Sequence, residues 1–205
     1  MFKKNIPVIR QAVGDSWGEL ANIVKQHYGI TPEQLSKMTI KGIMDEVYHS
    51  KIAKLFLLPG RIFGALVLYK GILIPTEVNN LTSENNEKAM FWHRILNFPN
   101  KPPLIFALRM EYVGGNDIIE YVRYGMWIRM AMSVKDGALV FKSKGYVWNI
   151  VGMALPIPTW LILGNAIIIE KAMSDNQFYI DFTMIHPLLG KIFSYSGFFH
   201  IAEAL

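Results

Sequence analysis

Apolar and polar residues alternate with a period of two along most of the chain after Ile72, which is the pattern of half-buried β strands. Short segments rich in Asn, Gly, Pro and Asp interrupt the alternation, as the connections of successive hairpins do. The pattern predicts strands over 39–50, 72–81, 88–98, 104–113, 117–133, 138–150, 165–173, 177–186 and 191–202. Since a long sheet must hide its edges, we predict an α+β fold: a curved antiparallel β-sheet or barrel of about eight strands, calycin-like in general form.

Helical signals are confined to the first part of the chain and to one insert. Ser16-Trp17-Gly18-Glu19 has the form of a capping box, and apolar residues then recur at helical spacing until Gly29. Thr31-Pro32 marks the start of a second short helix. The apolar and basic segment 51–68 is predicted to form two short helical pieces that cover one end of the barrel.

The composition marks no second core, so a single domain over 1–205 is expected. It would consist of N-terminal helices (1–38) and a β-rich body (39–205) that carries the helical insert. Residues 145–169 form an uncharged run long enough for a transmembrane helix, but Pro156 and Pro158 lie in its middle. We interpret the run as a strand, a proline-rich connection and a second strand, in a soluble protein.

Composition and charge exclude several classes of function. The chain is 52% hydrophobic and 18% charged, so apolar side chains exceed what a minimal core needs, and some are expected to line a cavity. The net charge of +5 is spread along the chain, which argues against a nucleic-acid partner. Cysteine is absent and the five histidines lack metal-ligand spacing, so neither a metal nor another cofactor is expected. No signal peptide is recognised, and a cytoplasmic location is expected.

Five short motifs follow one another along the chain: Trp92-x-Arg94, Ile119-Glu120, Leu155-Pro156-Ile157-Pro158, Pro187-Leu188-Leu189-Gly190 and Tyr195-x-Gly197. In order and spacing they resemble one protein family, the domain of unknown function 4166 (DUF4166) family, over roughly residues 16–205. The ending HPLLGKIFSYSGFF is the most specific of them. In that family the domain occurs alone or behind a saccharopine-dehydrogenase-like nucleotide-binding domain. This chain has no G-x-G-x-x-G motif, so the resemblance implies a shared fold and leaves the function open.

Strand alternation places two lone charges on apolar faces. Glu120 shares even positions with apolar residues of the predicted strand 117–133, and Arg94 does so in 88–98. Because an unpaired buried ion is costly, we expect the two side chains to meet, directly or through a bound polar group. The pair is either a structural salt bridge or an anchor for the head group of a ligand, with Glu120 then also able to act as a general acid or base.

Three further residues are candidates for the same site. Trp92 shares its face with Arg94, and Tyr124 shares its face with Glu120. His186 is expected to point inward at a strand end, as a hydrogen-bonded core or rim histidine or, alternatively, as a proton-transfer partner of Glu120. Tyr146 and Trp148 are expected on an outer face beside lysines.

The sequence therefore favours binding of a hydrophobic small molecule or lipid inside a barrel, with Glu120 and Arg94 as polar anchors. An enzyme that uses Glu120 with Arg94 or His186, and an accessory domain that docks onto an oxidoreductase, remain alternatives. No nucleophile motif supports catalysis. Residues 51–70 are interpreted as a docked lid or as a portal that touches the membrane surface, in which case the protein is peripheral to the membrane.

Overall fold

The computed structural model describes residues 6–31, 33, 37–53, 67, 69–82, 89–122 and 124–205. Short helices precede a long series of strands. The strands are β1 Lys37–His49, β2 Gly71–Thr82, β3 Ala89–Leu96, β4 Leu104–Gly114, β5 Asp117–Tyr121, β6 Met126–Lys135, β7 Ala138–Ile150, β8 Met153–Ile157, β9 Asn165–Ala172, β10 Phe178–His186 and β11 Gly190–Ala204.

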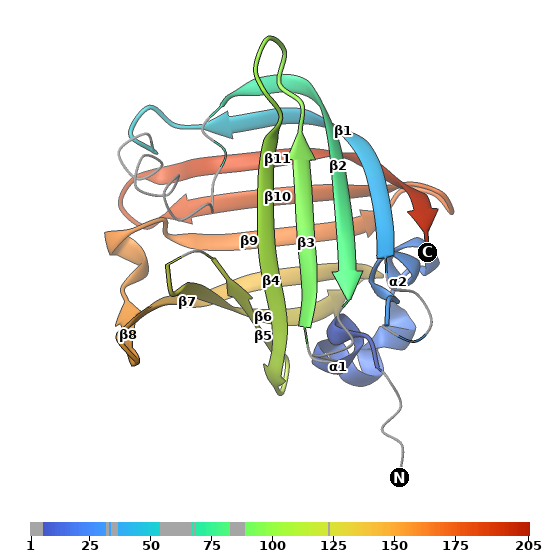
Figure 1. The fold of residues 1–205 in the computed structure, drawn as a ribbon, viewed down its shortest axis with the longest axis horizontal. Coiled ribbons are helices and arrows are strands. Elements are labelled where there is room, and N and C mark those ends of the chain that lie inside the picture. Colours follow the sequence, from blue (N-terminus) through green and yellow to red (C-terminus); the bar gives the residue numbers. More distant parts are fainter. Residues whose placement is uncertain are drawn as a thin grey trace.

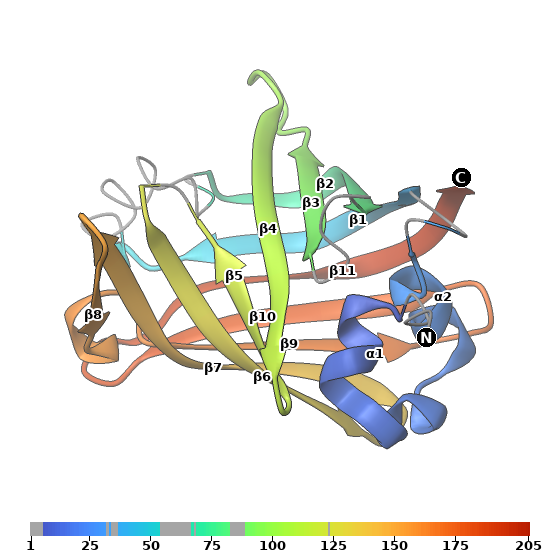
Figure 2. The same cartoon turned by 60° about the horizontal axis from the view of Figure 1, so that its bottom comes forward.

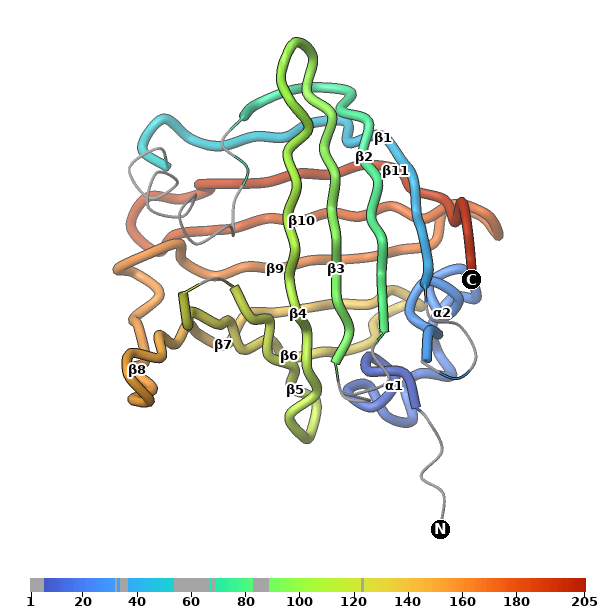
Figure 3. Tube along the Cα trace, viewed as in Figure 1, coloured from blue at the N-terminus to red at the C-terminus, as the bar shows by residue number. Residues whose placement is uncertain are grey.

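The strands form a closed antiparallel barrel (Figure 1). Each strand from β1 to β7 pairs with the next along the chain, and β9, β10 and β11 follow the same rule. The pairing of β7 with β9 and of β1 with β11 completes a ring of ten strands. β8 lies outside the ring, paired to β7. The last strand thus returns beside the first, as the chain trace in Figure 3 shows.

The predicted barrel is confirmed, but about eight strands was too low a number. The predicted strand 117–133 is two strands, because Tyr124 and Gly125 have φ angles of 58° and 76° and reverse the chain between β5 and β6. The proline-containing connection also contains β8, which we did not expect. Apart from these additions, the strand, connection and strand predicted for 145–169 are found, and none of the helices in the described residues is long and apolar enough to cross a membrane.

On the side away from β6, β7 pairs with two different strands along its length. Residues 139–142 pair with β9, whereas residues 146–150 pair with β8. Between the two halves the register with β6 slips by one residue beside Gly145, whose φ is 151°. A one-residue slip turns all following side chains to the opposite face. Tyr146, which we predicted on the outer face, therefore points inward and is 1% exposed.

The helices cover one end of the barrel (Figure 2). They are α1 Val8–Val13, a 3-10 helix Gly14–Glu19 and α2 Asn22–Tyr28. The predicted capping box was wrong, because Ser16 lies inside the 3-10 helix and neither α-helix has a side-chain cap. The predicted end at Gly29 is confirmed. The second predicted helix and the insert fall largely on residues 32, 34–36, 54–66 and 68, which lie outside the described residues.

Two glycines allow β1 and β11 to approach closely enough to close the ring. Gly42 on β1 is paired with Phe199, and Gly197 on β11 is paired with Met44. A Cβ at Gly42 would overlap the carbonyl oxygen of Phe198, and a Cβ at Gly197 would overlap that of Ile43. β1 also has two register shifts in this region, which bend the strand.

We expect Gly42→Ala and Gly197→Ala each to lower the free energy of unfolding by about 1–3 kcal/mol, because backbone must move to admit the methyl group. Gly18→Ala is the control, since no atom lies within 4 Å of its added Cβ. Urea titration of the three variants followed by circular dichroism measures the difference. Equal stability of all three would contradict the close-approach argument.

Candidate functional site

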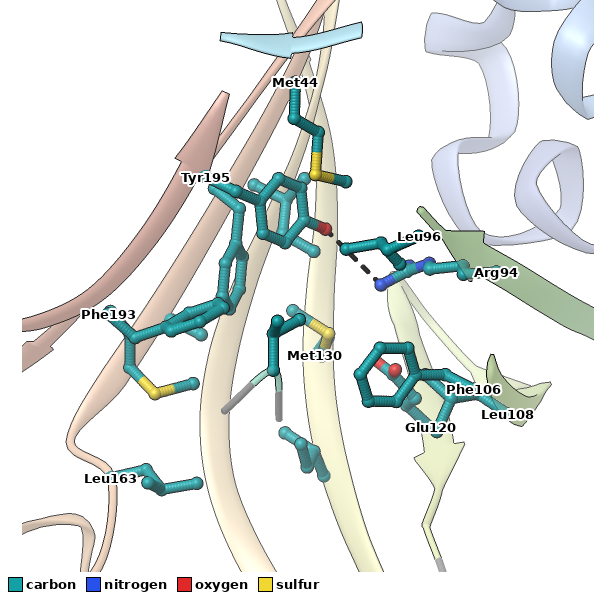
Figure 4. A pocket seen from close by; sticks show the side chains of 16 residues that line it. Met44, Arg94, Leu96, Phe106, Leu108, Glu120, Met130, Leu163, Phe193 and Tyr195 are labelled. Carbon is teal, nitrogen blue, oxygen red and sulfur yellow. Dashed lines mark hydrogen bonds between the residues drawn. The ribbon is translucent and has the colours of Figure 1, made fainter. Parts of the chain in front are cut away.

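The barrel interior contains a mainly apolar cavity of about 70 Å³. Its polar lining side chains, within the part of the chain that is described, are Arg94 on β3, Glu120 on β5 and Tyr195 on β11. Figure 4 shows the three in an otherwise apolar wall. The wall includes several flexible or aromatic side chains, among them Met44, Met130, Met184, Phe106, Phe182 and Phe193.

Arg94 is held by two aromatic residues. Its guanidinium carbon lies 4.4 Å from the centre of the Trp92 ring, a cation–π contact, and its Nη1 donates a hydrogen bond of 3.3 Å to the hydroxyl oxygen of Tyr195. Burial opposes the charge of Arg94, but the oxygens of Tyr195 and Glu120 leave its pKa raised. No carboxylate among the described residues forms a salt bridge with Arg94. Among the described residues, the Tyr195 hydroxyl is the hydrogen-bond acceptor of Arg94, whose guanidinium carries further N–H donors.

Glu120 faces the same cavity without touching Arg94. Arg94 is paired across β4 with Phe106, while Glu120 is paired with Met110, four residues further along that strand. This offset is about 13 Å at the usual rise of an extended chain. The two charges do not form a direct salt bridge. Their contact through a bound polar group stays a prediction, and the predicted inward face was correct for both residues.

The carboxyl group of Glu120 is poorly stabilised as an anion. Its side chain is 8% exposed and makes no hydrogen bond to the described residues. Desolvation raises the pKa of Glu120, and the positive charge of Arg94 opposes this only in part. Tyr146 lies in the same row of the sheet, two strands away from Glu120, and its buried hydroxyl also has no hydrogen-bond partner among the described residues. Desolvation and the charge of Glu120 both raise the pKa of Tyr146, so its hydroxyl stays protonated.

A second, smaller cavity of about 20 Å³ adjoins Arg94 and Tyr195 on the helix side. It is lined by a buried cluster in which the carboxylate of Glu170 on β9 accepts a hydrogen bond of 2.5 Å from the Tyr28 hydroxyl and contacts His27 Nδ1 at 3.1 Å. Unlike Glu120, Glu170 is thus fully engaged. The sequence prediction missed this cluster, because β9 reads Ile-Ile-Ile-Glu-Lys with apolar residues on both faces, so alternation does not show which charge points inward.

The other predicted site residues lie in three different places. Trp92 is buried, supports Arg94 and lines the smaller cavity. Tyr124 lies in the β5–β6 turn and is 65% exposed, so the inward orientation predicted for it was wrong. His186 is buried as predicted, but away from the cavity wall: its Nε2 donates to the Trp160 carbonyl at 2.7 Å and its Nδ1 accepts from the Leu188 N–H at 3.1 Å. Those bonds give His186 the structural role.

Tyr195 is the site residue that strand alternation could have found. It alternates with Phe193, Gly197 and Phe199 on the inner face of β11, and it belongs to the Tyr195-x-Gly197 motif. Burial raises the pKa of Tyr195, although Arg94 acts in the opposite direction, so the hydroxyl keeps its proton. Within the described residues no group of three acidic, histidine or cysteine side chains is placed to hold a metal ion.

The fold and the cavity define the class of this protein: an antiparallel β-barrel domain with a small, mainly apolar interior site. The model of the domain of unknown function 4166 family matches residues 20–199, and the chain belongs to that family. No curated protein and no solved structure matches the chain. The family carries no assigned activity, so the function has to be inferred from the site.

The isolation of Glu120 predicts a characteristic pH dependence for Glu120→Gln. A raised native pKa means that the folded protein binds the proton more tightly than the unfolded chain, so stability falls as pH rises from the ordinary glutamate pKa, about 4.3, through the native one. The amide cannot ionise, and we expect the variant to be more stable than the parent at pH 7 and equal to it near pH 4. Thermal unfolding at both pH values measures this. A variant that is less stable at pH 7 would show that Arg94 depends on the carboxylate.

Removal of the Tyr28 hydroxyl, which donates to Glu170, is predicted to destabilise the protein. Tyr28→Phe keeps the ring but removes the hydrogen bond to a buried carboxylate, and should lower the free energy of unfolding by about 1.5–3 kcal/mol. Tyr112→Phe is the matched control, since the Tyr112 hydroxyl makes an exposed hydrogen bond of 3.3 Å to the Gly115 carbonyl. Chemical denaturation of both variants tests this. Equal losses would remove the special role assigned to the Glu170 cluster.

Proposed function

We propose that this protein binds a small, mainly apolar molecule inside the barrel, with an anionic or hydrogen-bond-accepting head group beside Arg94 and Tyr195. One observation carries the proposal: Arg94 and Glu120 face one apolar cavity, and neither has an ionic partner among the described residues. A buried guanidinium without a carboxylate is costly in a protein that binds nothing. A ligand oxygen would remove that cost.

The donors in the cavity converge on one type of ligand group. Arg94 Nη1 already donates to Tyr195, which leaves the Tyr195 hydroxyl hydrogen and the remaining guanidinium N–H groups for an acceptor. A carboxylate can accept from both. Glu120, with its raised pKa, can share the cavity with such an anion by remaining protonated.

The size of the cavity limits the ligand. At about 70 Å³ it is smaller than the roughly 300–1,000 Å³ of typical ligand sites. It accommodates a head group and a short apolar segment. A longer chain requires Met44, Met130 or Met184 to move, and unbranched methionine side chains do this readily.

An acid–base enzyme is the second candidate, supported by the desolvated carboxyl group of Glu120. The described cavity wall offers Glu120 no histidine or second carboxylate, since His186 lies elsewhere. Binding is therefore the better supported function.

Arg94→Met should weaken binding of dodecanoate by about tenfold or more, because a charge-assisted hydrogen bond is lost. Dodecanol, which has the same chain and no charge, should bind more weakly than dodecanoate to the parent and about equally to both proteins. Displacement of a fluorescent fatty acid measures the affinities, and native mass spectrometry of the purified protein checks for molecules already bound.

Arg109→Met is the matched control for this experiment. Arg109 lies on β4, with its guanidinium carbon 4.2 Å from the Tyr121 ring, but lines no part of the cavity. The Arg109→Met variant should bind dodecanoate as the parent does. Absence of binding to the parent, or equal binding by the Arg94 and Arg109 variants, would refute the proposal.

A further inference from the structure

The end of the barrel opposite the helices has an exposed apolar surface. We call it the β8 surface and define it by Trp148, Val151, Met153, Leu155, Trp160 and Leu188. Val151 is 95% exposed, Leu188 77%, Met153 63% and Trp160 56%. Figures 1 and 2 both place β8 and the β10–β11 turn on the side of the barrel away from α1 and α2.

Strand pairing and a shared hydrogen-bond partner, the buried His186, link these residues in the fold. Trp148 is paired with Leu155 across the β7–β8 hairpin, and Val151 lies in the turn of that hairpin. Trp160 follows β8 by three residues, and its carbonyl accepts a hydrogen bond from His186. His186 in turn accepts one from the N–H of Leu188. The surface thus extends from the β7–β8 hairpin to the β10–β11 turn.

Val151, at the tip of the β7–β8 hairpin, has a strained backbone conformation. Val151 has a φ of 51°, a region that β-branched residues rarely occupy and that Asn or Gly would adopt with less strain. The valine is also almost fully exposed, so it gains nothing from core packing. Strain without a folding benefit points to a role for the side chain outside the folded chain.

Basic residues gather beside the β8 surface. Lys70 and Lys191 lie on the Tyr48 ring, with their Nζ atoms 5.2 Å and 5.0 Å from its centre. Lys51 follows Ser50, whose N–H donates to the Ile192 carbonyl at 2.8 Å, and so lies in the same region. All three lysines are exposed.

The acidic residues that lie nearest to these lysines are Asp45 and Glu46 on β1, two to three residues before Tyr48. Residues 147–169 and 182–202 contain neither Asp nor Glu. At the helix end, by contrast, the described turns and helices carry Asp15, Glu19, Asp136 and Asp175. Among the described residues beside the β8 surface, the three lysines thus outnumber Asp45 and Glu46.

We propose that the β8 surface docks on an anionic lipid bilayer, with Val151 and Trp160 entering the headgroup region and the three lysines contacting acidic headgroups. Exposed Trp and aliphatic side chains next to lysines are what an interfacial membrane contact needs. A second copy of the chain fits less well, because a two-fold contact through this surface brings two lysine clusters together. The proposal uses residues outside the cavity and does not depend on ligand binding.

Vesicle co-sedimentation of the full chain tests the docking. The parent should bind vesicles of phosphatidylcholine and phosphatidylglycerol in equal parts more tightly than vesicles of phosphatidylcholine alone, and rising salt should weaken this binding. Val151→Asn with Trp160→Ser should lower the affinity at least about tenfold, the effect of roughly one apolar side chain that is no longer buried. Lys70→Gln and Lys191→Gln should each lower it about fivefold.

Matched controls separate docking from loss of fold. Asn is compatible with the φ of residue 151, so Val151→Asn alone should remain folded and still bind more weakly. Met173→Ser and Lys135→Gln remove an exposed apolar residue and an exposed lysine near the other end, and should bind as the parent does. The proposal fails if the parent ignores anionic vesicles, if the β8-surface variants bind normally, or if analytical ultracentrifugation shows that the surface joins two copies of the chain instead.

Discussion

The close pairing of β1 with β11 is the constraint on which the interior of this protein depends. The first and last strands pair from Met38 to His49 of β1, and at Gly42 and Gly197 the two backbones are too close to admit a Cβ atom. Once they meet, the meander is a closed ring without long free edges, and its inner faces enclose a common space. The closure also brings Tyr195 on β11 to Arg94 on β3, residues 101 positions apart in the chain. Without it Arg94 would lack its hydrogen bond to Tyr195.

The buried carboxyl groups of Glu170 and Glu120 have different surroundings. Glu170 accepts a hydrogen bond from Tyr28 and contacts His27, both on α2, so it attaches α2 to the barrel wall. Glu120 faces an apolar cavity without a hydrogen-bond partner among the described residues, and desolvation raises its pKa. A folded protein tolerates such a group because it can become neutral. Glu170 is thus held by hydrogen bonds within the fold, whereas the proposed function places Glu120 beside the ligand.

The two ends of the barrel differ in whether helices cover them. One end is covered by α1 and α2, whose apolar residues complete the core. The opposite end presents Val151, Trp160 and Leu188 to the outside, next to lysines. An exposed apolar surface of this kind is a liability unless it contacts something. A protein that holds an apolar molecule inside and rests on a membrane at one end could exchange that molecule with the bilayer, which joins the two proposals without making either depend on the other.

The sequence by itself determined the β-rich meander and the inward faces of Arg94, Glu120 and Trp92, because alternation with a period of two is a local property that survives in the folded strand. It could not determine the register between strands, and an offset of four residues along β4 is what separates Arg94 from Glu120. The one-residue register slip that turns Tyr146 on β7 inward could not be predicted either, because a bulge depends on how two strands pair with each other. The Glu170 cluster and the contact of Tyr195 with Arg94 were decided by closure of the ring, which joins residues far apart in the chain. Tertiary structure thus determined the neighbours of Arg94, Glu120 and Trp92, whose inward faces followed from the sequence.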